Sequence, residues 1–427
     1  MKEVSGFSKL SKLEKIDWLK SQLPKAYSLN VLPDYWLADK GTQKLIEEFS
    51  ENTIGNFILP FGVAPNFLID ETVYAVPFVI EESSVVAASA KSAKFWLSRG
   101  GFRTKSITTL KNGQVHFFYT GDKQSLFEKF EAEKSSFFEA VTDLSKNMEK
   151  RGGGIKDLEL KDMTEEIPNF YQLYATFETC DAMGANFINS ILEKLGQTIN
   201  TWDDVEVNMC ILSNYTPECK VNIEVRCPIN ELKGVAKDID ARDFANRFKQ
   251  AVDIAKCDVR RAVTHNKGIF NGIDAVILAT GNDFRAIEAC GHAYAARDGK
   301  YRGLTSCDVS DGEFMFEIDI PLALGTVGGL TNLHPMAKVS LEMLGNPNAE
   351  ALMKIVAAAG LAQNFGALRS LVTTGIQQGH MKMHLLNILN QLNASKEEIK
   401  RAKEYFTQRT VSFSAVRDFL AKADTLH

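Results

Sequence analysis

Five short segments combine glycine with residues that carry charge or transfer protons, and they are the first place to look for chemistry. These segments lie at residues 51–55, 181–186, 265–268, 325–329 and 379–381. Each also has a structural interpretation. Asp181 and Asp283 suit helix N-caps, Lys267 suits a solvated loop, and the glycines suit tight turns. The residue types alone leave both interpretations open.

Glu82 is a candidate for proton transfer. The apolar run at 74–80 predicts a buried strand, and Glu81 and Glu82 follow it with side chains on opposite faces, so only one of them enters a shared site. A buried glutamate has a raised pKa and donates a proton near neutral pH. The alternative is a carboxylate that simply stabilises the N-terminus of the next helix.

His380 and His384 are four residues apart and share one face of a helix, as metal-binding histidines do. The residues between them are Met-Lys-Met, without the glutamate of an H-E-x-x-H site, and no acidic or cysteine ligands cluster nearby. We therefore predict no metal site. A histidine beside Gly379 is better suited to proton transfer.

The sequence lacks the glycine fingerprint of a Rossmann dinucleotide site, because no G-x-G-x-x-G follows a strand. A helix that begins near Asp181, with the small residues Ala182, Gly184 and Ala185, still brings backbone N–H groups close to a diphosphate. The residues themselves thus indicate an α/β enzyme with an unusual phosphate-binding helix.

Composition limits the classes of partner. The 427 residues are 45% hydrophobic and carry 49 basic against 54 acidic side chains, a formal charge of −5 without a long basic block, which argues against nucleic acid. The seven cysteines are scattered and never spaced C-x-x-C, which argues against disulfides and thiolate zinc. The charged N-terminus lacks the apolar core of a signal peptide, and no apolar run approaches the roughly 18 residues of a membrane span. We expect a cytoplasmic protein.

The elements that position these residues predict an α+β fold. A helical start precedes the strand at 74–80 and a helix after Ser83 and Ser84, which we expect to cap it. From 104 a separate module follows in the order ββαββαβ: a strand, a hairpin turn at 111–113, a strand at 114–120, a helix to Met148, strands at 155–160 and 170–179, a helix from 181 and a strand at 205–212. Beyond 240 helices dominate, with one strand at 275–279 leading to Asp283. The last fifty residues predict a small helical cap.

Taken together, the motifs resemble 3-hydroxy-3-methylglutaryl-CoA reductase of the soluble, class II, bacterial and archaeal type. The segments ENTIG, VIEESSVVAASA, DAMGAN, THNKGIFNGIDAVILATGND, GTVGG followed by HP, and GIQQGHM occur in the order of that family between about 51 and 384. The resemblance implies that two hydrides from NADPH or NADH reduce the thioester to mevalonate and free coenzyme A, or that the reverse oxidation occurs. The alternative that the residues leave open is a CoA-thioester hydrolase or transferase without redox chemistry.

The resemblance places the catalytic roles on four residues. Lys267 stabilises the oxyanion, Asp283 holds Lys267, and Glu82 donates a proton to the carbonyl oxygen. His380 protonates the departing CoA thiolate, a transfer that is downhill because a thiol has a pKa of about 8.5 and imidazolium about 6.5.

Substrate and cofactor contacts follow from the same resemblance. Those to substrate are Ser84, Arg261, Asn271 and Gln363, with Arg261 facing the substrate carboxylate. Those to cofactor are Ser145, Lys146, Asp181, Met183, Gly184, Asn186 and Asn214.

The resemblance also implies the domain plan. A large, mainly helical substrate domain (1–103 and 217–374) carries an inserted ferredoxin-like, non-Rossmann cofactor domain (104–216). A mobile C-terminal flap (375–427) carries His380, and each site is shared by the two subunits of a homodimer.

Two positions depart from the family pattern. Ser83 replaces a proline of many relatives, and we expect it to be tolerated as a helix cap. Ser145, followed by Lys146, replaces the aspartate that holds the adenosine ribose in NAD-preferring relatives. Without that carboxylate, and with a cation beside it, a 2′-phosphate is acceptable. We therefore predict NADPH over NADH.

Overall fold

The structure is a computed structural model that describes residues 2–235, 239–373, 385–406, 409 and 411–424. The chain divides into two compact units, residues 1–61 and 62–427. The first unit is helical, as predicted. Its elements are η1 (Phe7–Lys9), α1 (Lys12–Gln22), η2 (Tyr27–Tyr35) and α2 (Lys40–Glu47).

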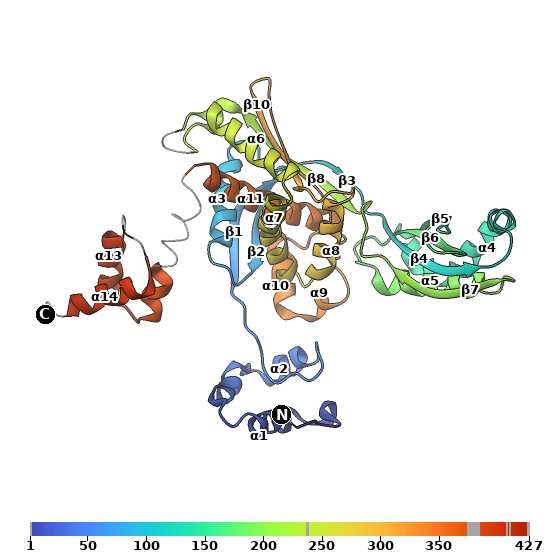
Figure 1. Cartoon of the computed structure of the whole chain (residues 1–427), viewed down its shortest axis with the longest axis horizontal. Coiled ribbons are helices and arrows are strands. Elements are labelled where there is room, and N and C mark those ends of the chain that lie inside the picture. Colours follow the sequence, from blue (N-terminus) through green and yellow to red (C-terminus); the bar gives the residue numbers. More distant parts are fainter. Residues whose placement is uncertain (1, 236–238, 374–384, 407–408, 410, 425–427) are drawn as a thin grey trace. The chain divides into compact units, whose positions relative to one another are not determined.

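The larger unit contains a core built on a four-stranded antiparallel sheet. The strand order is β3 (Arg103–Ile107), β8 (Lys220–Pro228), β10 (Glu313–Pro321) and β9 (Thr305–Ser310). The helices packed into the same core are α3 (Val85–Leu97), α6 (Ala241–Cys257), α7 (Val259–Ala279), α8 (Phe284–Ala295), α10 (Pro335–Met343) and α11 (Ala349–Val372). In Figure 1, α7 and α11 lie at the centre of this core, and α3 packs beside α11 at its edge.

A two-stranded hairpin, β1 (Phe61–Ile69) and β2 (Thr72–Val79), leads into the acidic turn and α3. The predicted strand at 74–80 is confirmed. The predicted serine cap is wrong: Ser84 occupies the N-cap position, but its φ is 78° and its side chain makes no capping hydrogen bond. A left-handed backbone at a residue other than glycine costs energy and is concentrated at functional sites.

The strand predicted at 275–279 is wrong, because these residues form the last turns of α7. The apolar run is buried from Ala275 to Ile277 and at Ala279, so it lacks the polar face by which a helix is recognised. The strands that do exist beyond 217, namely β8, β9 and β10, were not predicted. Their side chains alternate between buried and partly exposed, which is the period of a half-buried strand.

A second sheet forms a module with its own hydrophobic core. The elements follow as β4 (Lys111–Tyr119), α4 (Lys123–Glu149), β5 (Gly154–Asp162), β6 (Phe170–Glu178), α5 (Ala185–Ile199) and β7 (Val205–Leu212), with sheet order β5-β6-β4-β7 (Figure 1). All neighbouring strands are antiparallel. The predicted long helix and the strands from 155 onward are confirmed.

The hairpin predicted at 111–113 is wrong. β3 pairs with β8 in the other sheet, and Asn112-Gly113 lies inside β4, paired with Thr176 and Ala175. Gly113 serves a different purpose there: a Cβ at this position would lie 2.5 Å from Leu192 of α5. The glycine admits a close helix, not a turn. The module therefore has the order βαββαβ instead of ββαββαβ.

The described C-terminal part is helical, with a helical segment from Leu385, then α13 (Lys396–Tyr405) and α14 (Phe413–Asp424), which share a small apolar cluster. His380 and His384 lie outside the described residues.

One described helix, α11, is long and apolar enough to cross a membrane, but 78% of its apolar window is buried inside the protein. Its burial on all sides is that of a core helix.

A close contact between α7 and α11, at Gly272, leads to a testable prediction. A Cβ on Gly272 would lie 2.5 Å from the Ala359 carbonyl oxygen, whereas a Cβ on Gly268, one turn earlier, meets nothing within 4 Å. We expect Gly272→Ala to destabilise the protein by about 1–3 kcal/mol, because α7 must move away from α11. Gly268→Ala, the matched control, should be neutral or stabilising by up to about 1 kcal/mol. Thermal unfolding measures both, and equal stability of the two variants would contradict this packing.

Candidate active site

One pocket gathers the catalytic and substrate residues predicted on described parts of the chain, except Asp283. It is formed by the acidic turn with the start of α3, by the polar face of α7, and by the C-terminal half of α11, and its volume is about 260 Å³. Its lining includes Glu82, Ser84, Arg261, Lys267, Asn271 and Gln363. These residues are up to about 280 positions apart in the sequence, so the fold and not local sequence brings them together.

A direct ion pair lies at the mouth of this pocket. Lys267 Nζ is 2.6 Å from Glu82 Oε2, with side-chain exposures of 60% and 37%. The pair joins α7 to the turn after β2. It places a cation and a carboxyl group within reach of the same carbonyl oxygen, an arrangement suited to stabilising an oxyanion and transferring a proton to it.

The remaining pocket residues offer donors to an anionic, oxygen-rich ligand. Arg261 is half-buried, which lowers its pKa, and it forms no ion pair with any described residue. Gln363 Oε1 accepts from Ser89 Oγ at 2.7 Å, which fixes the amide and leaves its nitrogen available to the pocket. An unpaired guanidinium beside polar amides and the Ser84 hydroxyl is suited to hold a carboxylate.

A buried network beneath the pocket was missed by the sequence analysis. His265 Nε2 lies 2.6 Å from Thr305 Oγ1, whose hydroxyl donates to Asn364 Oδ1 at 3.2 Å. Because the Thr305 proton goes to Asn364, the histidine donates from Nε2, and it is neutral: burial, aided by Arg261 and Lys256, lowers its pKa to about 3. This hydrogen-bonded network of His265, Thr305 and Asn364 holds α7 against β9 and α11 without adding charge. Only His265 lies in a segment that the sequence analysis singled out, and its pairing with Thr305 was not predictable.

Asp283 has contacts other than those predicted. It caps α8, accepting from Arg285 and Ala286 backbone N–H groups at 3.0 and 3.3 Å, which confirms the capping interpretation. Its carboxylate also pairs with the Arg285 guanidinium at 2.9 Å, which lowers the pKa of Asp283. The described contacts of Lys267 include Glu82 and not Asp283, so the predicted Asp283–Lys267 contact stays a prediction.

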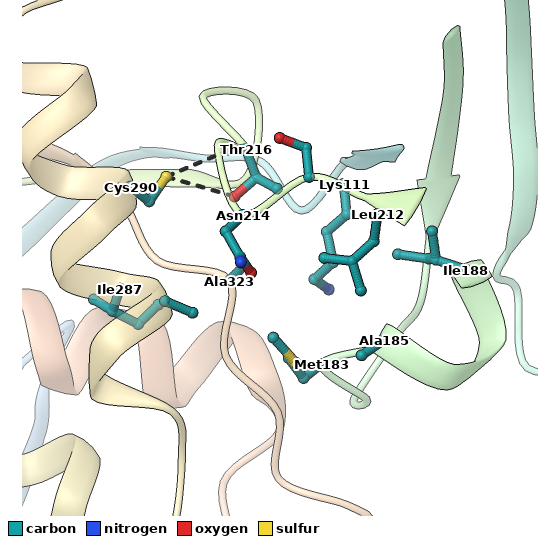
Figure 2. Close-up of a pocket in the computed structure, with 12 residues that line it drawn as sticks. Lys111, Met183, Ala185, Ile188, Leu212, Asn214, Thr216, Ile287, Cys290 and Ala323 are labelled. Atoms are coloured by element: carbon teal, nitrogen blue, oxygen red, sulfur yellow. Dashed lines mark hydrogen bonds between the residues drawn. The ribbon is translucent and has the colours of Figure 1, made fainter. Parts of the chain in front are cut away.

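A second pocket, between the βαββαβ module and α8, contains two of the predicted cofactor residues, Met183 and Asn214 (Figure 2). Gly184 occupies the N-cap position of α5 with a φ of 93°, and Asn186 is exposed in its first turn. The helix therefore begins at Ala185, four residues later than predicted. Its first backbone N–H groups have no side-chain cap and remain free for an anion.

Helix α5 starts late because the residues before it, 181–182, pair with residues 326–327. Backbone N–H groups of Thr326 and Val327 donate to the Asp181 carbonyl, and Ala182 bridges to Val327. The Asp181 carboxylate accepts from Ala349 N at 2.8 Å, at the start of α11. A Cβ on Gly325 would lie 2.5 Å from Met183 N, so only glycine allows this approach. Asp181 thus anchors two segments: its carboxylate accepts the first backbone N–H of α11, whose N-cap is Asn348, and it does not cap α5.

Ser145 does not fit its predicted cofactor contact. It is 1% exposed, and its single hydroxyl proton is shared between Glu149 Oε1 at 2.7 Å and Val141 O at 3.1 Å, both within α4. The reason is helical phase: Phe137, Val141 and Ser145 lie on the buried stripe of α4. Lys146, the next residue, is exposed.

Lys111 also lines the second pocket and was missed as a functional candidate, because it was assigned to a turn. The described residues contain no cluster of three potential metal-ligating side chains, and His380 and His384 are not among them.

Comparison with known proteins agrees with this geometry. The sequence profile of the hydroxymethylglutaryl-coenzyme A reductase family matches residues 13–385. The 3-hydroxy-3-methylglutaryl-coenzyme A reductase of Archaeoglobus fulgidus is 39% identical over 359 residues, 83% of this chain and 80% of that protein. A probable reductase of the same name from Borreliella burgdorferi is 33% identical over 399 residues, 92% and 89% of the two chains.

Solved structures extend the similarity to the fold. The class II 3-hydroxy-3-methylglutaryl-CoA reductase of Streptococcus pneumoniae, bound to NADPH in open conformations, has a TM-score of 0.75 at 35% identity, covering 97% of this chain and 100% of that one. The chain therefore belongs to the hydroxymethylglutaryl-coenzyme A reductase family, in its class II branch. The predicted oxidoreductase function is confirmed with it, and nothing in the comparisons supports the hydrolase alternative.

Two acidic side chains, on α7 and α8, share a partly buried environment, which leads to a prediction about the pH dependence of stability. Asp274 on α7 hydrogen-bonds with Glu288 on α8, and burial together with that carboxyl raises the pKa of Asp274 to about 8. Asp274 Oδ1 is buried without another partner among the described residues. The native protein therefore binds a proton that the unfolded chain releases near pH 4.

Because the native protein holds this proton more tightly than the unfolded chain does, the proton adds to the free energy of unfolding. This contribution is complete below about pH 4 and is lost as the pH rises through about 8. We expect Asp274→Asn to keep the hydrogen bond without titrating, so its melting temperature should exceed that of the wild type increasingly from pH 5 to pH 9, by about 2 °C or more. Exposed Asp311→Asn is the control. A difference between Asp274→Asn and wild type that is constant with pH would contradict the shared proton.

Proposed function

We propose that the pocket around Lys267 and Glu82 binds 3-hydroxy-3-methylglutaryl-CoA and reduces its thioester to mevalonate and coenzyme A. The observation that carries this proposal is the 2.6 Å ion pair of Lys267 with Glu82, inside a pocket whose other polar groups suit a carboxylate. Hydride addition to a thioester, and then to the aldehyde that it yields, is favoured by a fixed cation and a proton donor at one carbonyl oxygen.

The roles of the pocket residues follow from their positions. The Lys267 ammonium faces the oxygen on which negative charge develops at each hydride addition. Glu82, in contact with Lys267, takes up a proton from solvent before each hydride addition and then delivers that proton from its neutral carboxyl group to the oxygen. Arg261 pairs with the free carboxylate of the substrate, while Ser84, Asn271 and Gln363 orient its hydroxyl and carbonyl oxygens. His380, in the C-terminal flap, protonates the CoA thiolate.

We propose the βαββαβ module, a ferredoxin-like arrangement, as the cofactor domain. NADPH supplies the hydrides when bound. The free N-terminus of α5 with Met183, Gly184 and Asn186 suits its diphosphate, and Asn214 suits its nicotinamide end. Preference for NADPH is supported by exposed Lys146, whose cation suits a 2′-phosphate, and by the NADPH bound in the Streptococcus pneumoniae reductase. Ser145 contributes to this preference only because it lacks the carboxylate that NAD-preferring relatives have at this position.

We propose further that the chain works in the cytoplasm as a homodimer or a multiple of dimers. The seven cysteines are all free, as in a reducing compartment. An apolar stripe is exposed along α9 (Leu330–Leu333) and α10, and its members are Leu330, Leu333, Met336, Val339 and Met343. A stripe of this size on a helix face suits a second copy of the chain. A monomer in sedimentation analysis would contradict the dimer.

Removing the Lys267 cation tests the proposal. We expect Lys267→Ala to lower kcat at least about a thousandfold, the upper range for loss of one oxyanion-stabilising group. The melting temperature should stay within about 2 °C of the wild type, because the side chain is largely exposed. NADPH oxidation in the presence of 3-hydroxy-3-methylglutaryl-CoA measures the rate.

Lys249→Ala is the matched control, because Lys249 also forms a 2.6 Å ion pair, with Asp253, but on a helix surface away from the pocket. It should retain full activity. Activity in Lys267→Ala within tenfold of the wild type would reject the oxyanion role.

A further inference from the structure

Lys111, at the start of β4, is a buried cation in the wall of the second pocket. Its exposure is 4%, and no carboxylate forms an ion pair with it in the part of the chain that the structure describes. Its partners are neutral oxygens: Nζ donates to Thr179 Oγ1 at 2.6 Å and to the Ala182 carbonyl at 3.3 Å. Burial of an ammonium without an opposite charge is costly, so buried cations are normally paired.

The two oxygens that Lys111 holds belong to the turn that begins α5. The Thr179 hydroxyl, itself fully buried, also donates to the Ala182 carbonyl at 2.7 Å, so the ammonium, the hydroxyl and the carbonyl form a closed triangle under this turn. Gly184 lies directly on Thr179, since a Cβ on Gly184 would be 2.5 Å from Thr179 Cγ2. The position of the α5 N-terminus therefore depends on this triangle.

The third N–H of the ammonium is not used by any described protein group. Figure 2 shows the Lys111 side chain extending from the strand toward Met183, between Asn214 and Leu212, in the pocket that they line together. The ammonium and the uncapped N-terminus of α5 are thus two independent sources of positive potential beside one space. The space itself has a volume of only about 20 Å³, so an anionic ligand bound over the free N–H groups of α5, beside this space and not inside it, supplies the missing counter-charge.

We propose that Lys111 is a positioning residue for the cofactor, which fixes the turn at 179–184 and whose charge is neutralised only when the phosphate groups of the dinucleotide bind. The role rests on the proposed function, since it takes the module as the cofactor domain. It predicts that affinity for the cofactor, and not the chemical step or the binding of the thioester, depends on the charge at position 111.

The test is the affinity of the full-length chain for NADPH by isothermal titration calorimetry, with kcat and both KM values measured in parallel. We expect Lys111→Met to raise the Kd and KM for NADPH about ten- to a hundredfold, the range for loss of a charged hydrogen bond. The value of kcat and the KM for 3-hydroxy-3-methylglutaryl-CoA should change less than about threefold. Lys111→Arg, which keeps the charge, should restore most of the affinity.

Two further variants separate charge from structure. Lys111→Gln keeps a hydrogen-bond donor to Thr179 but removes the charge. It should lose affinity for NADPH as Lys111→Met does, and it provides the test if the methionine variant is unstable. Lys156→Met is the matched control, because Lys156 also donates to two backbone oxygens of the module, those of Gly152 and Gly153, outside the pocket. It should bind NADPH like the wild type.

The outcomes distinguish this role from the proposed function. Tight NADPH binding by the wild type that Lys111→Met and Lys111→Gln leave unchanged would overturn the role of Lys111 alone. Equal losses in Lys111→Arg and Lys111→Met would overturn the requirement for charge. Failure of the wild type to bind NADPH would overturn the cofactor assignment and this role with it.

Discussion

The active site depends on holding the Lys267 ammonium against the Glu82 carboxylate, because the two groups come from elements that have no local reason to meet. Glu82 is placed by the turn after β2, where the backbone of Ser84 is left-handed. Lys267 is placed by α7, whose depth in the core is set by its contact with α11 at Gly272. The uncharged hydrogen-bonded network of His265, Thr305 and Asn364 then fixes the orientation and axial position of α7 below the pocket. Burial, aided by the nearby cations of Arg261 and Lys256, keeps His265 neutral, so this network adds no charge beneath the pocket.

A second constraint joins the two four-stranded sheets of the larger unit. The segment before α5 runs beside residues 325–327, and it leaves no room for a side chain at Gly325. The Asp181 carboxylate extends this junction to the first turn of α11, the helix that also carries Gln363. The turn of the proposed cofactor pocket and the floor of the substrate pocket are therefore fixed to the same helix. This shared anchor fixes the proposed cofactor domain in place relative to the proposed substrate pocket.

Much of this was accessible from sequence, because strong local patterns and ordered motifs agree. The long helix α4, the strands around it and the pocket residues Glu82, Arg261, Lys267, Asn271 and Gln363 were identified before any geometry. The errors have physical causes. Residues 275–279 are apolar on all sides, so a buried helix could not be told from a buried strand. Asn112-Gly113 has the composition of a turn, but its glycine is required by the approach of α5 to β4. The partners of Lys111 and His265, which are Thr179 and Thr305, could not be predicted because they lie far along the chain, where no local pattern reveals them.

The central claim is that a single pocket performs two successive hydride reductions on one thioester. The most direct measurement is the stoichiometry of the purified chain acting on 3-hydroxy-3-methylglutaryl-CoA, counting NADPH oxidised against coenzyme A released, and repeated with NADH. We predict that two NADPH are oxidised for each coenzyme A released, with a higher kcat/KM for NADPH than for NADH. Release of coenzyme A without oxidation of either cofactor would contradict it, and equal efficiency with the two cofactors would contradict the assignment of Lys146.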